Sequence, residues 1–337
     1  GILSIRERFE RAMREDPSNL SPDVLYPIID ATTVKRTRQF VKKHYTGDYI
    51  DGPDGKRQPI VFPKPKAISV RYNLDDLLPG FFDQLEDTLD PDGGNAITFV
   101  RYMPDGFLMV GPEAEEDARA HAMVGLLRSG LLKRFESSAF AFRKTVEKMV
   151  REHGAFLEAL DAGYVVTTAF MKELSGDDEA LFEDLLEATE HQTDAALYDT
   201  DSLRAAVERD RDLLQALADE AATITPERDP KLKVLTNALV EIAEQAESEA
   251  TDNIDEVQRR KVLVFSFFED TVEWIQHYLI DELAQRPELV GYRGRMVAVS
   301  GSGDLAEVSR QQAVQGFAPI SMEASAGQDA DRYDLLI

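Results

Sequence analysis

Apolar positions in the last third of the chain alternate between short continuous runs and stretches with helical spacing. The continuous runs cover residues 261–266, 295–300 and 333–337, and the amphipathic stretches cover residues 231–246, 271–283 and 305–317. Uniformly apolar strands that alternate with helices are typical of a parallel sheet with both faces covered. The pattern from residue 226 onward therefore predicts an α/β fold built on a parallel sheet.

The preceding two thirds of the chain have mainly helical periodicity. Residues 1–44 carry an amphipathic stripe, and residues 123–156 and 202–220 repeat apolar side chains at three- and four-residue steps. We expect the stretch 123–156 to be one long helix, interrupted near Gly154. This part of the chain is thus predicted to be mainly helical.

Short β-branched and aromatic runs predict a few strands within the same part. Residues 60–63 and 68–72 have the composition of short strands, and residues 97–102 and 107–110 are predicted to form a hairpin around the Pro-Asp-Gly sequence between them.

These patterns divide the chain into residues 1–75, 76–225 and 226–337, which suits a length of 337 residues. The sequence stops at Ile337 within an apolar run, where a buried parallel strand normally continues into a crossover helix. We therefore expect Gly1 and Ile337 to bound a piece of a longer protein.

The composition excludes several kinds of site. The chain has no cysteine, so disulfides, thiolate zinc sites and a cysteine nucleophile are excluded. Its five histidines show no metal-ligand spacing, and we expect no metal site. There is no apolar run of about 18 residues and no signal-peptide pattern at the N-terminus, so we expect a cytoplasmic protein.

Charge is distributed very unevenly along the chain. The formal net charge is −25, yet residues 35–71 contain ten Lys and Arg against three Asp. Residues 173–201 contain eleven Asp and Glu and no Lys or Arg. A basic groove on an acidic protein can still bind nucleic acid, because binding depends on the local field. The acidic stretch is either a solvated connector or a docking surface for a protein partner.

Ligands of parallel α/β sheets bind beyond the carboxyl ends of the strands, so the residues after each run are the candidates. Ser266 ends the first run and Phe267 follows it; Ser300 ends the second run and Gly301 follows it. Arg310 lies on the next predicted helix. These residues could contact phosphate through hydroxyl, amide and guanidinium groups. The alternatives are an ordinary strand end, an ordinary Gly-Ser loop, and an ion pair between Arg310 and Glu307.

Three segments in this part resemble consecutive blocks of the Swi/Snf-like superfamily-two ATPases. The run that ends in Phe265 and Ser266, before a helix with Trp274, looks like motif IV at the entry to the second RecA-like lobe. Residues 299–301 with Arg310 and residues 316–319 resemble the next block, and residues 333–337 look like the strand before motif V.

Two upstream segments extend the resemblance over most of the chain. Residues 33–38, with Phe62 and Pro63, are similar to the basic element at the end of the first lobe. Residues 130–143 resemble a helix of the bacterial RapA/HepA-like and phage-defence helicases.

The resemblance implies an ATP-dependent helicase or translocase that acts on nucleic acid, with double-stranded DNA favoured. Residues 1–75 would end the first lobe and supply the basic crossover, residues 76–225 would be a helical insertion, and residues 226–337 would form a RecA-like lobe truncated near motif V. The implied nucleic-acid contacts are Ser266, Phe267, Ser300, Gly301 and Arg310. The implied groove or interlobe residues are Lys35, Arg36 and Arg38.

The chain departs from the family where phosphate chemistry is concerned. It contains no G-x-x-x-x-G-K-[ST] sequence and no Asp-Glu-x-His box. ATP and Mg²⁺ would therefore serve the intact protein, and we expect this chain alone to bind neither and to be inactive. An alternative function is a non-catalytic α/β and helical adaptor that binds a protein partner through its acidic helical region. As a piece of a motor, the chain would instead bind nucleic acid and the missing motor segments.

Overall fold

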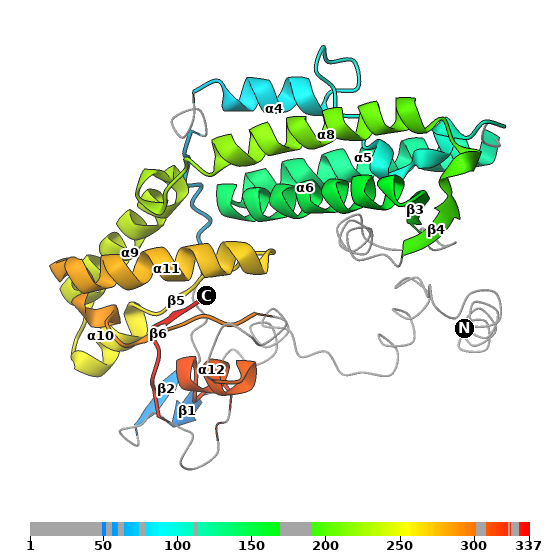
Figure 1. Ribbon diagram of the computed structural model, residues 1–337. Coiled ribbons are helices and arrows are strands. Elements are labelled where there is room, and N and C mark those ends of the chain that lie inside the picture. Colours follow the sequence, from blue (N-terminus) through cyan, green and yellow to red (C-terminus); the bar gives the residue numbers. More distant parts are fainter. Residues whose placement is uncertain are drawn as a thin grey trace, which may run out of the picture. The chain divides into compact units, whose positions relative to one another are not determined.

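The computed structural model describes residues 49–51, 56–59, 64–73, 79–110, 114–168, 190–300, 308–322, 324 and 330–337. The chain divides into two compact units, Gly1–Ser69 and Val70–Ile337. In the first unit, strands β1 (Tyr49–Asp51) and β2 (Arg57–Pro59) form an antiparallel pair. The described part of the second unit is mostly helical and contains small sheets (Figure 1).

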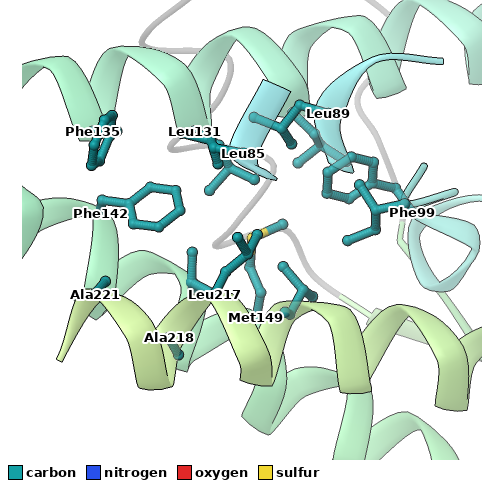
Figure 2. Close-up of a cluster of buried hydrophobic side chains, with 14 of the residues drawn as sticks. Leu85, Leu89, Phe99, Leu131, Phe135, Phe142, Met149, Leu217, Ala218 and Ala221 are labelled. Atoms are coloured by element: carbon teal, nitrogen blue, oxygen red, sulfur yellow. The ribbon is translucent and has the colours of Figure 1, made fainter. Parts of the chain in front are cut away.

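Amphipathic helices build the first part of the second unit. They are α4 (Phe81–Leu89), α5 (Ala114–Ser137), α6 (Ala139–Asp161) and α8 (Thr200–Ala221), and α5, α6 and α8 lie side by side in Figure 1. Their apolar faces meet in one buried cluster that includes Leu85, Leu131, Phe142, Met149 and Leu217 (Figure 2). Burial of such side chains stabilises the folded state by about 1.5–3 kcal/mol each. The predicted mainly helical character of this part is confirmed.

The prediction of one helix over residues 123–156 with a break near Gly154 is wrong. The helix is interrupted at Ser138, whose backbone is extended, and Gly154 lies within α6. The Ser138 hydroxyl accepts a hydrogen bond from the Ala141 amide at 3.0 Å, so it caps the new helix. The same hydroxyl lies 2.8 Å from the Thr271 hydroxyl of a later helix. A tertiary contact therefore accompanies the cap at the break.

The predicted hairpin of residues 97–102 and 107–110 is also wrong. Two backbone amides of its first strand, those of Thr98 and Val100, donate to the buried Asp210 carboxylate on α8 at 2.9 and 3.2 Å. The chain then forms 3₁₀ helices η2 (Val100–Tyr102) and η3 (Pro104–Phe107). Burial raises the pKa of Asp210, although these donors oppose the shift. The Asp210 carboxylate thus accepts hydrogen bonds from backbone amides that a hairpin would need as donors.

The backbone around Leu108 pairs with a different partner from the one predicted. Leu108 forms an antiparallel bridge to Tyr198, next to η4 (Ala195–Leu197). An antiparallel pair that the sequence did not predict, β3 (Tyr164–Thr168) and β4 (Glu190–Asp194), lies between α6 and α8 along the chain.

Residues 64–73 contain no strand, so the predicted strand at 68–72 is wrong. Ile68, Val70 and Tyr72 have the alternating pattern of a strand, but all three side chains are exposed. A half-buried strand needs a core to cover its apolar face, and this segment has none. The predicted elements at 1–44 and 60–63 lie outside the described residues.

The predicted parallel α/β sheet in the last part of the chain is confirmed. Its helices are α9 (Pro230–Glu249), α10 (Asn253–Arg259), α11 (Glu269–Gln285) and α12 (Arg310–Phe317), with η5 (Pro226–Arg228) and η6 (Pro287–Tyr292). The strands β5 (Val262–Leu263), β6 (Met296–Val297) and β7 (Leu335–Leu336) pair in the order β5-β7-β6. Helix α10 lies in a stretch for which the sequence pattern predicts no helix. The predicted segment boundaries near residues 75 and 225 stay predictions.

Side-chain alternation along β7 explains how the helices cover the sheet. Leu335 and Ile337 pack in the cluster that contains Leu279 of α11, whereas Leu336 packs in the cluster that contains Ala313 of α12. Alternate residues of a strand point to opposite faces, so α11 and α12 lie on opposite faces of the sheet. Right-handed crossovers that run in opposite directions along a sheet produce this arrangement.

Within the described ranges, none of the helices combines the length and the apolar character that spanning a membrane requires.

His153 is a buried titratable group in the helical part. Its Nδ1 lies 2.7 Å from the Met149 carbonyl oxygen, which can only accept, so Nδ1 carries the proton. Nε2 is buried without a hydrogen-bond partner among the described residues. Burial lowers the pKa of His153 to about 4, and the positive charges of Arg101 and Arg211 act in the same direction.

Acidification should therefore destabilise the helical part through His153. Between pH 6.5 and about 4 the unfolded chain binds a proton at this site that the native chain does not, so stability falls as pH falls. The full effect is about 3 kcal/mol at 1.36 kcal/mol per pKa unit. Urea denaturation of wild type and His153→Gln between pH 7 and 4 measures it: the variant should lose less stability. The exposed His277→Gln is the control, and equal losses in all three proteins would contradict the assignment.

Candidate nucleic-acid interface

The carboxyl edge of the parallel sheet collects the segments that follow its strands. β5, β6 and β7 run in the same direction, so their carboxyl ends meet at one edge. Ser266 and Phe267 lie beyond β5, Ser300 lies beyond β6, and Ile337 follows the central strand β7. Residues that are more than 30 positions apart in the sequence are thus placed at the same edge of the sheet.

The loop after β5 presents aromatic side chains to solvent. Phe267 is 71% exposed and Phe265 is 86% exposed, which is unusual for large apolar side chains. The Ser266 hydroxyl lies 3.4 Å from the Phe268 carbonyl oxygen, at the outer limit of a hydrogen bond. This hydroxyl can therefore turn to another acceptor at small cost.

Ser300 and Arg310, two other residues of the predicted site, differ in their exposure to solvent. Ser300 is only 8% exposed, so its side chain is buried at the end of the strand. Gly301 lies outside the described residues, as does Glu307, the alternative partner of Arg310. Arg310 is exposed and is the first residue of α12, after the Ser309 capping box. A helix N-terminus carries partial positive charge, so the guanidinium and the helix start favour the same kind of ligand, an anion.

The predicted basic residues Lys35, Arg36 and Arg38 lie outside the described residues. Further along the same basic segment, Lys64, Lys66 and Arg71 are exposed. Their charge is available to solvent, as a phosphate contact requires.

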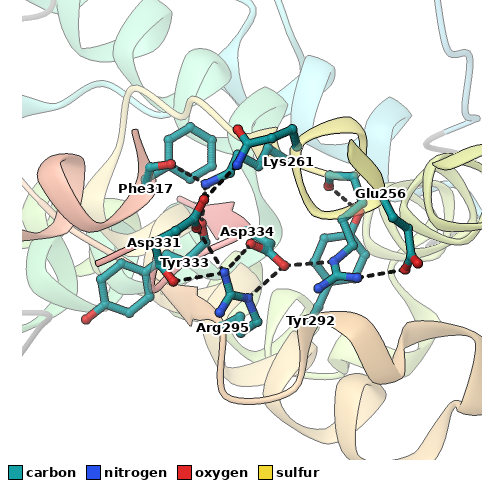
Figure 3. Close-up of polar contacts among 10 residues, drawn as sticks. Glu256, Lys261, Tyr292, Arg295, Phe317, Asp331, Tyr333 and Asp334 are labelled. Atoms are coloured by element: carbon teal, nitrogen blue, oxygen red, sulfur yellow. Dashed lines mark hydrogen bonds and ion pairs between the residues drawn. The ribbon is translucent and has the colours of Figure 1, made fainter. Parts of the chain in front are cut away.

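The amino edge of the sheet holds a polar cluster with a structural role. The fully buried carboxylate of Asp334, next to β7, accepts from Arg260 Nε at 2.7 Å and from Arg295 Nε and Nη2 at 2.8 Å each (Figure 3). Arg260 precedes β5 and Arg295 precedes β6, so one carboxylate joins the starts of all three strands. The hydrogen bond to Asp334 raises the pKa of Arg295, which stays charged. We call Asp334, Arg260 and Arg295 the strand clasp.

A second carboxylate supports the clasp. Asp331 accepts from Lys261 Nζ at 2.8 Å and from Arg295 Nη2 at 2.9 Å. Lys261 also donates to the carbonyl oxygens of Phe317 and Tyr333 (Figure 3). Because both carboxylates are engaged by cations, neither is available as a metal ligand.

The described residues do not fit ATP with Mg²⁺. Among them, no group of three or more His, Cys, Asp or Glu side chains could hold a metal ion. The sequence also lacks the glycine-rich loop with lysine that cradles phosphates. We therefore assign no phosphoryl-transfer step to this part of the chain.

The sequence pattern predicts a helix around Arg134 but does not predict its contact with the loop after β5. Arg134 of α5 lies with its guanidinium carbon 4.3 Å from the centroid of the Phe268 ring, and it pairs with Asp270 at 3.1 Å. Residues 134 and 268 are far apart in the chain, and no periodicity links them. Trp274 is buried, and its indole N–H donates to Asp229 at 2.9 Å.

The chain matches no family model, no curated protein and no solved structure. Residue chemistry and geometry at this edge are therefore the basis of the functional argument.

Removal of the central carboxylate of the strand clasp should destabilise the protein strongly. Asp334→Asn places an amide donor against guanidinium donors in a buried site, and breaking a buried ion pair costs about 3–5 kcal/mol. Asp331→Asn is the matched control: its carboxylate is 28% exposed, so a smaller loss of about 1 kcal/mol is expected. Urea denaturation of both variants gives the comparison. Equal losses would show that Asp334 has no special role.

Proposed function

We propose that this chain is the second-lobe part of a Swi/Snf-like superfamily-two motor that binds duplex DNA at the carboxyl edge of its parallel sheet. The observation that carries the proposal is the β5-β7-β6 order with α11 and α12 on opposite faces. This arrangement supports a RecA-like lobe, because it brings the motif IV-like loop beside the strand that resembles the approach to motif V. Ligands of such sheets bind at this edge.

The proposed contacts follow from the side chains present. The Ser266 hydroxyl and the Arg310 guanidinium would bind phosphate oxygens, and the exposed Phe267 ring would pack against sugar or base. Backbone amides around Ser300 and Gly301 would face the phosphate backbone. Contacts of this kind position a duplex without reading its sequence.

Electrostatics limits where DNA can bind on this acidic chain. The net charge is −25, so association needs a local basic region. Arg310 supplies one exposed cation at the start of α12. We propose that Lys35, Arg36 and Arg38 extend the track or hold the junction between lobes.

ATP hydrolysis belongs, in this proposal, to the intact motor. Bound ATP with Mg²⁺ supplies phosphoryl-transfer chemistry, and the residues that hold it would lie in motor segments other than this chain. The contribution of this chain is the second lobe, which binds and moves along the duplex. A phage-defence role remains part of the family resemblance.

An adaptor that binds a protein partner is the second candidate. The observation that favours it is a set of exposed apolar side chains with a spacing of two: Leu263 in the edge strand β5, and Phe265 and Phe267 in the loop that follows it. Such edges recruit other chains by strand addition or apolar contact. The acidic region near residues 173–201 would then add a charged docking surface.

Duplex binding by the Arg310→Gln variant tests the proposal. Anisotropy of a labelled duplex of about 20 base pairs, titrated at low salt with the 337-residue chain, should show affinity that falls three- to tenfold in this variant. One lost phosphate contact should also reduce the slope of log K against log salt by about 1.

The matched control is Arg332→Gln, which makes the same charge change. Arg332 is exposed and lies at the other end of α12, because its amide donates to the Gly316 carbonyl at 2.8 Å. Its affinity should stay within twofold of wild type. Equal losses in both variants would indicate a nonspecific charge effect, and absence of duplex binding by the wild-type chain would favour the adaptor.

A further inference from the structure

The carbonyl group of Phe268 is a junction between α11 and the loop that carries Ser266 and Phe267. Its oxygen accepts from the amides of Thr271 and Val272 at 3.1 and 3.2 Å, so Phe268 caps the helix. The same oxygen accepts from the Ser266 hydroxyl at 3.4 Å. Phe268 therefore links the first turn of α11 to the loop that carries Ser266 and Phe267.

The Phe268 side chain is held by a residue from outside the sheet. Its ring is 7% exposed, and the Arg134 guanidinium of α5 lies over it at 4.3 Å. On the loop side, the exposed Phe267 ring meets the Phe268 ring edge-on, with centroids 5.2 Å apart and planes at 71°. A contact path thus runs from α5 through Phe268 to the solvent-facing Phe267.

Arg134 is itself fixed in position. It is buried, and its Nη1 lies 3.1 Å from Asp270 Oδ2 in the first turn of α11. The guanidinium thus lies over the Phe268 ring while one of its nitrogens donates to a carboxylate. Lysine at this position would keep the charge but would lose the guanidinium contact with the ring.

Other contacts hold α11 against α5 and α6 independently of Arg134. Lys144 pairs with Asp270 at 2.9 Å and with Glu273 at 2.7 Å. Thr271 bonds to the hydroxyls of Ser137 and Ser138 at 2.8 Å each. The rings of Phe140 and Trp274 stack, with centroids 5.0 Å apart. A change at Arg134 therefore alters the Phe268 contact and leaves the junction of the helices in place.

We propose that Arg134 is a positioning residue for the nucleic-acid interface: it acts through Phe268 to hold Ser266 and Phe267 in their binding positions. This inference rests on the proposed function. It makes the helical part of the chain a determinant of DNA affinity, although Arg134 lies behind the loop. Any displacement of α5 relative to the sheet would be transmitted to the loop by the same contact.

The test combines duplex binding with two structural readouts in the full chain. Arg134→Gln and Phe268→Leu should each weaken duplex binding three- to tenfold, and the double variant should lose no more than the larger single loss, because both remove one contact. Arg134→Lys, which keeps the charge opposite Asp270, should retain wild-type thermal stability and still bind weakly. Lys144→Gln, which removes an ion pair to Asp270 without touching Phe268, should bind within twofold of wild type.

Trp274, the single tryptophan of the chain, reports whether the helix junction is intact. Its emission should be unchanged in the Arg134 variants, while hydrogen exchange of the loop amides at residues 266–268 should become faster. Wild-type affinity in Arg134→Lys and Arg134→Gln, alongside weak binding by Arg310→Gln, would overturn the inference and leave the proposed function standing.

Absence of duplex binding by the wild-type chain would overturn the proposed function and with it the DNA role of Arg134. Hydrogen exchange of the amides at residues 266–268 would then test whether Arg134 positions the loop. Faster exchange in Arg134→Gln would support positioning of the loop by α5, and unchanged exchange would overturn it.

Discussion

The buried Asp334 carboxylate is the constraint on which the α/β part of the chain depends. Each described strand of the sheet is two residues long, so few ladder hydrogen bonds hold the strands together. Asp334 joins Arg260 and Arg295 by three charge-assisted bonds, and its carbonyl accepts from Val262 of β5 at 2.8 Å. These bonds fix where each strand starts. Because the strands are parallel, the same bonds determine which residues reach the opposite edge, where we propose that DNA binds.

The break at Ser138 has a comparable influence on the helical part. By ending α5 and starting α6 there, it creates a helical hairpin whose turn faces Thr271 of α11. Arg134 and Lys144, on the two arms of that hairpin, both reach Asp270. The helical part is therefore attached to the first turn of α11, directly beside the loop after β5. This attachment is what allows a residue of α5 to influence the proposed interface.

The failed predictions of the hairpin and of the single long helix share a physical cause. The hairpin at 97–110 had the right composition, but the amides of Thr98 and Val100 are bonded to Asp210, more than 100 residues away. Residues 123–156 have uninterrupted apolar periodicity, which predicts one helix, whereas in the structure the Ser138 hydroxyl caps a new helix at this point. In each case a side chain supplied the hydrogen bonds that regular structure would have supplied, and periodicity does not report such competition.

Local sequence is enough to predict the alternation of strands and helices after residue 226, the amphipathic helices before it, and the positions of Ser266, Phe267 and Arg310 beside strand ends and a helix start. These features follow from local periodicity and chain direction, which are written in neighbouring residues. The strand order, the strand clasp of Asp334 and the contact of Arg134 with Phe268 emerge only when the chain is folded. Those depend on residues far apart in the chain, whose meeting is set by packing and by the pairing of buried charges.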